Sequence, residues 1–222
     1  MITALAIAGA FVTTALQAAE TGPYIRLENG VNSISGAKAE APGLGKTSIK
    51  FSSGYAVGGA VGYNFNPIAL ELQYDYSGSE VQELSVVSLS QHTVLANVIY
   101  SAKLDDTFSA NVGLGAGFQA QSNNLPSGTV TNYNFDGYTV NGAGSSKSDA
   151  AFAAQLKTGL SAKLVENVSV DIGYSLRYIG ESDVYGVSGS ISNGVTTFNG
   201  SGTLKLTSHW DHLFSVGLTY KF

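Results

Sequence analysis

The sequence predicts an all-β protein, an eight-stranded antiparallel up-and-down transmembrane β-barrel with long extracellular loops. Three observations lead to this prediction. Apolar and polar residues alternate with a period of two in eight segments, as they do in strands with one apolar face. The connections between these segments alternate between short and long, which is typical of membrane barrels. Charged residues make up only 12% of the chain, against roughly a quarter in an ordinary soluble domain.

The first four predicted strands differ in how clearly they alternate. The first is the least regular, with two aliphatic residues opposite an arginine and a glutamate. The second sets aromatic and branched residues against Gly, Ala and Ser, and the third sets Leu and Tyr against Glu, Gln and Asp. The fourth has a weaker phase, with an asparagine opposite valines and a tyrosine. These predicted strands cover residues 24–35, 48–63, 68–76 and 89–100.

The last four predicted strands alternate cleanly. The fifth opposes apolar residues to Ser, Asn and Gly, the sixth opposes them to Gln, Lys and Gly, and the seventh to Ser, Asp, Gly and Arg. The eighth ends the sequence with an aromatic residue on its apolar face. Most segments have the 9–11 or so residues that a tilted strand needs to cross a bilayer. These predicted strands cover residues 107–119, 150–164, 168–178 and about 206–222.

The connections predict which end of the barrel faces the periplasm. The short connections are residues 64–67, 101–106 and 165–167. The long connections are residues 36–47, 77–88, 120–149 and 179–205. Short periplasmic turns and long external loops are the rule in outer-membrane barrels, and an even strand number places both termini at the periplasm. In the last long connection, Asn193-Gly194 between alternating residues predicts a hairpin that extends the sheet beyond the membrane.

The positions of the charged residues favour a membrane barrel, whose exterior faces lipid. They disfavour a secreted, lipocalin-like barrel, whose interior is apolar. Charged residues within the strands share a face with Gly, Ser and Asn, whereas Lys or Arg facing lipid would cost about 2–4 kcal/mol at mid-bilayer. The residues predicted to point into the lumen are Arg26, Glu28, Glu71, Gln73, Asp75, Gln155, Lys157, Asp171 and Arg177. Because buried charges must be paired, we interpret this set as a salt-bridge network that plugs the lumen. The alternative is a narrow, weakly conducting pore.

Small residues on the second strand are expected to make room for the longer side chains opposite.

Aromatic residues fall into two belts, as rings that favour the headgroup level do. The predicted periplasmic belt consists of Tyr63, Phe65, Tyr100, Phe108, Tyr220 and Phe222. The predicted outer belt consists of Phe51, Tyr74, Tyr76, Phe118, Phe152, Tyr178 and Trp210.

Several function classes find no support in the sequence. The chain has no cysteine and a net charge of -5 with scattered basic residues, so neither thiol chemistry nor nucleic-acid binding is expected. The stretch His209-Trp-Asp-His212 suggests metal or acid–base chemistry, but on a strand His209 and Asp211 face one way and His212 the other. We therefore predict no catalytic residue, no metal and no cofactor, and the protein is not expected to be an enzyme.

The N-terminal residues predict an export signal. Residues 2–16 are almost uninterruptedly apolar, too short for a transmembrane helix but suited to a signal peptide. The basic residues that usually open a signal peptide are missing, since the first one is Arg26. The predicted division is a cleaved signal peptide over residues 1–18 and a barrel domain over residues 19–222.

Several short motifs together resemble the opacity-protein-like and surface-antigen family of eight-stranded outer-membrane barrels. They are residues 57–65 (VGGAVGYNF), 95–100 (LANVIY), 112–118 (VGLGAGF), 155–159 (QLKTG), 171–174 (DIGY) and the terminal strand. The resemblance implies an integral outer-membrane protein of a Gram-negative bacterium with no catalytic residue. It also implies that the terminal strand, with Tyr220 and Phe222, is the signal read by the barrel-assembly machinery.

The function expected from this resemblance is a structural or surface-interaction role, adhesin-like or antigen-like, carried by the external loops. The alternative is a small porin-like channel, and a third possibility is a lipid-modifying outer-membrane enzyme. The expected partners are outer-membrane lipid, the assembly machinery and an extracellular ligand at the loops, whose identity stays open.

Overall fold

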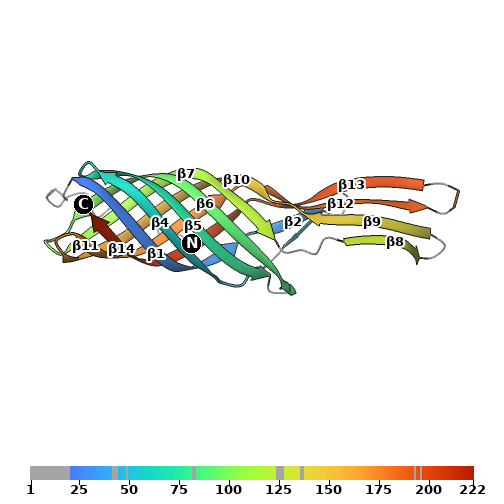
Figure 1. Ribbon diagram of the computed structural model, residues 1–222, viewed down its shortest axis with the longest axis horizontal. Coiled ribbons are helices and arrows are strands. Elements are labelled where there is room, and N and C mark those ends of the chain that lie inside the picture. The colour runs from blue at the N-terminus through green and yellow to red at the C-terminus, as the bar shows by residue number, and fades with distance from the viewer. Residues whose placement is uncertain are drawn as a thin grey trace.

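The computed structural model describes residues 21–41, 45–48, 50–81, 84–123, 128–135, 138–192, 194–195 and 197–222. These residues form a closed eight-stranded barrel and a six-stranded sheet that projects from one of its ends (Figure 1). In the described part of the chain, no helix is long and apolar enough to cross a membrane. The predicted signal peptide, residues 1–18, lies outside the described residues.

The barrel is antiparallel throughout, and its eight strands are joined in the order β1-β14-β11-β10-β7-β6-β5-β4, with β4 pairing back to β1. The predicted fold class is therefore confirmed. The period-two alternation located these strands because each has one face outside the barrel and one inside. Their bounds are β1 Gly22–Ser35, β4 Gly54–Asn64, β5 Ile68–Val81, β6 Leu84–Lys103, β7 Phe108–Asn123, β10 Asp149–Val165, β11 Val168–Ile179 and β14 His209–Lys221.

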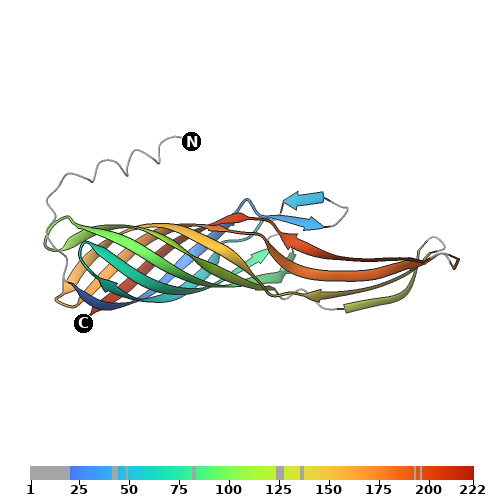
Figure 2. The same cartoon turned by 90° about the horizontal axis from the view of Figure 1, so that it is seen from above.

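One end of the barrel, which we call the turn end, carries three short turns and the C-terminus (Figure 2). Strands β1 and β14 close the barrel along its length, pairing from Tyr24↔Lys221 at the turn end to Ser35↔Trp210 at the opposite end. In one turn the backbone N–H groups of Phe108 and Thr107 donate to Asp105 Oδ1, each at 2.7 Å. These bonds lower the pKa of the Asp105 carboxyl, and the bond from Phe108 has the larger effect. They do so because they favour the charged form.

The opposite end, the sheet end, differs from the prediction of long loops, because most of the connections are themselves strands. Segments expected as loops pair in the order β3-β2-β13-β12-β9-β8, and β5 and β6 continue past their predicted ends. The predicted hairpin of the last connection is confirmed, with pairs from Ser182↔Leu206 to Ser192↔Thr197. The other segments of this sheet gave no strand signal because they lack a continuous apolar face. The bounds are β2 Lys38–Ala41, β3 Gly45–Ser48, β8 Gly128–Phe135, β9 Tyr138–Ser146, β12 Ser182–Ser192 and β13 Thr197–Leu206.

The second predicted strand, residues 48–63, was wrong at its start. Strand β4 begins at Gly54, and Phe51 is only 9% exposed. Phe51 therefore does not belong to the outer aromatic belt, and Ile49 lies outside the described residues. The prediction failed here because the apolar–polar alternation continues through residues 51–53, which precede β4 and are not part of a barrel strand. Phe51 belongs to an apolar cluster that we call the apolar cap, together with Ile34, Ala37, Leu89, Leu206 and the partly buried Val184.

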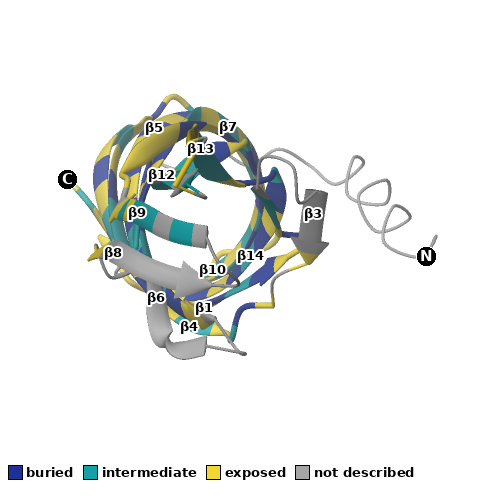
Figure 3. Ribbon diagram, turned by 90° about the vertical axis from the view of Figure 1, so that its right-hand side faces the viewer, coloured by how far each residue is buried: buried dark blue, intermediate teal, exposed yellow. Residues whose placement is uncertain are grey.

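The other predicted belt residues agree with the structure. Burial alternates along the barrel strands, as the banded colours of Figure 3 show. All six rings of the predicted periplasmic belt are exposed at the turn end, and five of the outer belt are exposed, with Tyr76 half-buried. The exposed outer-belt rings are Tyr74, Phe118, Phe152, Tyr178 and Trp210. Aliphatic side chains between the belts are also exposed. The barrel thus presents a continuous apolar band outward, as the sequence predicted.

Candidate functional site

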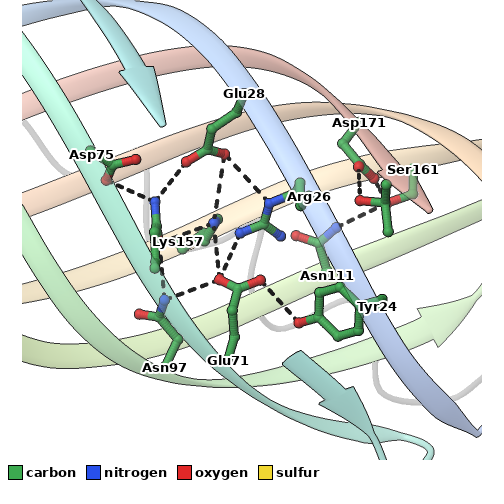
Figure 4. Close-up of polar contacts among 12 residues, drawn as sticks. Tyr24, Arg26, Glu28, Glu71, Asp75, Asn97, Asn111, Lys157, Ser161 and Asp171 are labelled. Atoms are coloured by element: carbon green, nitrogen blue, oxygen red, sulfur yellow. Dashed lines mark hydrogen bonds and ion pairs between the residues drawn. The ribbon is translucent and has the colours of Figure 1, made fainter. Parts of the chain in front are cut away.

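The lumen of the barrel holds the residues that the sequence predicted there. Seven of the nine are buried, and Arg26 and Asp171 are half-buried. They come from β1, β5, β10 and β11, so strands from different parts of the sequence supply one interior. Figure 4 shows how the charged members other than Arg177 lie.

Glu71 joins two cations of the lumen to two further polar side chains. Its Oε1 lies 2.6 Å from Arg26 Nη2 and 3.6 Å from Lys157 Nζ. Asn97 Nδ2 donates to the same oxygen at 3.1 Å, and the Tyr24 hydroxyl donates to Oε2 at 2.9 Å. The Glu71 side chain has no solvent exposure, so this carboxylate is stabilised entirely by protein groups.

Glu28 binds the same two cations from the other side (Figure 4). Its Oε2 lies 3.6 Å from Arg26 Nε and 3.8 Å from Lys157 Nζ. The Gln73 amide donates to Glu28 Oε1 at 2.6 Å. Each cation therefore bridges two carboxylates, and each carboxylate is shared by two cations.

A second ion pair joins this group through amide side chains. Arg177 Nη2 donates to Asp75 Oδ2, and Arg177 Nε donates to Gln155 Oε1 at 3.1 Å. Gln73 Nε2 donates to the same Asp75 oxygen at 2.9 Å, and Gln155 Nε2 donates to Gln73 Oε1 at 2.9 Å. The two glutamines thus link the Asp75–Arg177 pair to the Glu71 group.

We call this assembly the central network. Its three cations, Arg26, Lys157 and Arg177, face three carboxylates, those of Glu28, Glu71 and Asp75. Their formal charges cancel, as buried charges require if desolvation is to be compensated. The remaining members are Tyr24, Gln73, Asn97 and Gln155.

Two members of the central network were not among the predicted site residues. Asn97 lay in the segment with the weakest phase, and Tyr24 opened the least regular one. The available signal was their phase, because both lie at alternate positions with the inward-facing residues of their predicted strands, and both are buried.

Asp171 lies apart from the central network, toward the turn end. It accepts hydrogen bonds from Ser161 Oγ and, at 2.5 Å, from Thr219 Oγ1. Figure 4 shows it with Ser161 to one side of the ion pairs. The sequence placed it on the correct face but could not show that hydroxyl groups would be its partners.

Glycines on β4 make room for the long side chains of the lumen, as expected. A Cβ at Gly58 would lie 2.0 Å from Asp75 Oδ1, and a Cβ at Gly62 would lie 2.4 Å from the Tyr24 ring. Either distance is far below contact, so these positions admit only glycine while Asp75 and Tyr24 keep their places.

A cavity of about 180 Å³ occupies the lumen at the turn end. Its wall includes the turn residues Asp105 and Glu166, and it reaches Arg26, Glu28 and Lys157 of the central network. The more distant network members Asp75 and Arg177 do not line it. The cavity thus extends from the turn end to the central network.

On the other side of the central network the lumen is tightly filled. Gln91, Gln119 and Gln121 are at most 2% exposed and lie between the network and the apolar cap. In the described part of the chain, buried side-chain atoms without a hydrogen-bond partner occur in Arg26, Gln91, Gln119, Gln121, Ser182, His209 and Asp211. The sequence-based site did not include these glutamines, although their alternation on β6 and β7 placed them inward.

The histidine motif does not form a catalytic constellation. His209 and Asp211 are buried inside, with Nε2 and Oδ1 3.9 Å apart. His212 points outward and lies 2.8 Å from the Tyr174 hydroxyl. Among the described residues no group of three or more His, Cys, Asp or Glu side chains could hold a metal. The predicted divergence of the three residues is confirmed.

The two predicted assembly-signal residues lie on the outward face at the turn end. Tyr220 and Phe222 are exposed, and their rings meet edge to face at 5.0 Å. The Phe222 N–H donates to the Pro23 carbonyl at 3.1 Å, beside the β1–β14 closure.

Comparisons with known proteins agree with this architecture. Residues 2–222 match the family model described as "Outer membrane protein beta-barrel domain". The crystal structure of neisserial surface protein A is similar, with a TM-score of 0.56 and 19% identity over 93% of this chain and 99% of that one. The outer membrane protein OprG from Pseudomonas aeruginosa has a TM-score of 0.50 and 14% identity over 94% of this chain and 100% of that one. At these identities the likeness is one of fold. Among curated protein sequences, none matches this chain at a significant level.

Proposed function

Because this chain belongs to the outer membrane protein beta-barrel domain family, we propose that it is a plugged outer-membrane barrel whose role is structural or surface-interacting. In this role the barrel anchors and positions the projecting sheet. The proposal assigns no catalytic function to the lumen or to the His209–His212 motif.

The observation that carries this proposal is the filling of the lumen. The central network is charge-balanced and linked across β1, β5, β6, β10 and β11, and the apolar cap lies beyond it at the sheet end. An eight-stranded barrel has an interior only just wide enough for side chains. Moving ions through it would require breaking several buried ion pairs.

The projecting sheet is the part of the molecule best placed to meet a partner. It extends away from the barrel along the long axis of the molecule (Figure 1). A shallow hollow on β9, β12 and β13 is lined by small and hydroxyl-bearing side chains with one cation, Lys147. Adaptable hydroxyl groups on a rigid support suit polar ligands.

Shortening the β12–β13 hairpin tests this role. We expect that replacing residues 188–201 with Asn-Gly, a two-residue turn that suits a hairpin, leaves the barrel intact. Bacteria displaying the full protein should adhere to an epithelial cell layer better than bacteria without it. Bacteria displaying the shortened variant should fall to the level of those without the protein, as measured by counting attached cells.

The control for this experiment is the folded state of the variant. Val184 and Leu206, which belong to the apolar cap, are retained, so the heat-dependent gel shift of the barrel should be unchanged. Full adherence by the shortened variant, or no gain in adherence from the complete protein, would contradict the proposed surface role.

A narrow porin-like channel is the second candidate, and the cavity at the turn end favours it. That cavity already opens part of the lumen, so rearrangement of the central network and the apolar cap would suffice to complete a path. Conductance separates this candidate from the plugged barrel.

A further inference from the structure

Two tyrosine–histidine pairs on the outward face of the barrel have the same geometry. The Tyr74 hydroxyl lies 2.8 Å from His92 Nδ1, and the Tyr174 hydroxyl lies 2.8 Å from His212 Nδ1. In both pairs the histidine is displaced by two residues from the direct cross-strand partner of the tyrosine. The two pairs are therefore matched sites on one barrel.

The pairs lie on opposite sides of the barrel. One is on β5 and β6 and the other on β11 and β14, and in the strand order each strand is four positions from its counterpart. On β6 and β14 the four outward residues that follow the histidine toward the turn end are apolar or small, and the fourth is a tyrosine. They are Tyr100, Val98, Ala96 and Val94 on β6, and Tyr220, Leu218, Val216 and Phe214 on β14.

This spacing places both histidines near the outer edge of the apolar band. His92 and Tyr100 are eight residues apart along their strand, as are His212 and Tyr220. Eight residues span about 26 Å along a strand, or about 20 Å along the membrane normal at a tilt near 40°. The apolar band of such barrels is about 25 Å tall, so with the tyrosines at its inner edge the histidines lie roughly 5 Å below its outer edge. The direct cross-strand partner of His92 is Tyr76 of the predicted outer belt.

Both ring nitrogens of His212 have hydroxyl partners. Its Nε2 lies 3.1 Å from Ser35 Oγ, which is also 3.5 Å from the Trp210 carbonyl oxygen, and its Nδ1 lies 2.8 Å from the Tyr174 hydroxyl. A neutral imidazole has one donor and one acceptor, so both nitrogens of His212 are occupied.

His92 has the same tyrosine partner but no counterpart of Ser35. Its ring is exposed and contacts the rings of Tyr74 and Tyr76. Within the described residues nothing occupies its Nε2. In the tautomer in which Nδ1 accepts from the Tyr74 hydroxyl, Nε2 carries the hydrogen and is a donor near the outer edge of the apolar band.

We propose that His92, oriented by Tyr74 and flanked by Tyr76, is a binding site for the phosphate group of an outer-leaflet lipid. The Nε2–H group donates to a phosphate oxygen, while Val94 and Phe118 next to it contact the acyl chains. His212 is the matched position at which a protein hydroxyl already fills the place of the phosphate. The site rests on the membrane position of the barrel and is independent of the surface role proposed above.

Solid-state NMR on the full chain, refolded into vesicles of phosphatidylethanolamine and phosphatidylglycerol, tests this site. With ¹⁵N-labelled histidine, dipolar dephasing by ³¹P reports which imidazole nitrogens lie beside lipid phosphate. We expect dephasing at the Nε2 of one of the three histidines, measured in phosphate-free buffer so that only lipid supplies phosphorus. The protein in dodecyl maltoside micelles with added inorganic phosphate should show none. Dephasing there would assign the site to free phosphate and overturn the lipid proposal.

Three variants show which histidine gives the dephased signal. His92→Phe should abolish the dephasing, and His212→Phe should leave it in place, which keeps the assignment secure even if the first variant folds poorly. Ser35→Ala frees Nε2 of His212 and should add a second dephased signal. Absence of dephasing in the unmodified protein, its persistence in His92→Phe, or its loss in His212→Phe would overturn the proposal. Ser35→Ala without a second signal would overturn the argument that a free Nε2–H at this level is sufficient.

Discussion

Replacing Glu71 by Ala is expected to lower the free energy of unfolding of the barrel by about 3–5 kcal/mol. Glu71 pairs with Arg26 and Lys157, whose side chains are 11% and 7% exposed. Removing the shared carboxylate leaves these cations undercompensated, and breaking a buried ion pair from one side typically costs this amount. Urea unfolding in lipid vesicles, followed by the fluorescence of Trp210, the single tryptophan of the chain, measures the change.

The matched control is the ion pair at the turn end. Asp106 lies 3.1 Å from Lys103, and its side chain is 96% exposed. Replacing Asp106 by Ala should change the stability by less than about 1 kcal/mol, as is usual for exposed pairs. If Glu71→Ala were as stable as this control, the central network would not hold the lumen together.

Replacing Phe222 by Ala is expected to reduce strongly the amount of assembled barrel in cells while leaving refolding of the purified protein unaffected. We propose that Tyr220 and Phe222 are read by the assembly machinery. Phe222 is 69% exposed, and its backbone bond to Pro23 does not need the ring. Loss of the Phe222 ring is therefore expected to change the free energy of unfolding of the barrel little. Heat-dependent mobility on a gel, compared between outer-membrane fractions and detergent-refolded protein, separates assembly from stability.

Phe108 provides the control for this prediction. It is also an exposed aromatic residue at the turn end, but it begins β7 rather than lying beside the last strand. Phe108→Ala should assemble in cells like the unmodified protein. Normal cellular assembly of Phe222→Ala, or an equal defect in Phe108→Ala, would contradict the assignment of an assembly signal to the last strand.

The barrel itself could be predicted from the sequence because its strands meet two different environments. Lipid outside and a polar lumen inside impose opposite requirements on successive residues, and this produces a strong period of two. The same alternation failed at Phe51, where the pattern runs on through residues that are not in a barrel strand. Of the projecting sheet it indicated only the β12–β13 hairpin, because strands with solvent on both faces need no apolar face.

The pairing inside the lumen could not be predicted. Alternation shows that Glu71, Arg26 and Lys157 point inward, but their contact depends on the tilt and stagger of β5, β1 and β10 around the barrel. These strands are not direct neighbours, so no local pattern records their relative heights. The same holds for the tyrosine–histidine pairs, whose match appears only when the registers of two distant strand pairs are compared.

Single-channel recording in planar lipid bilayers tests the plugged lumen most directly. The purified, refolded barrel should insert, as shown by its recovery with the bilayer lipid, and yet produce no conductance steps at neutral pH. A porin added to the same bilayer confirms that steps would be detected. Stable, reproducible steps from the unmodified protein would contradict the plug and establish the channel instead.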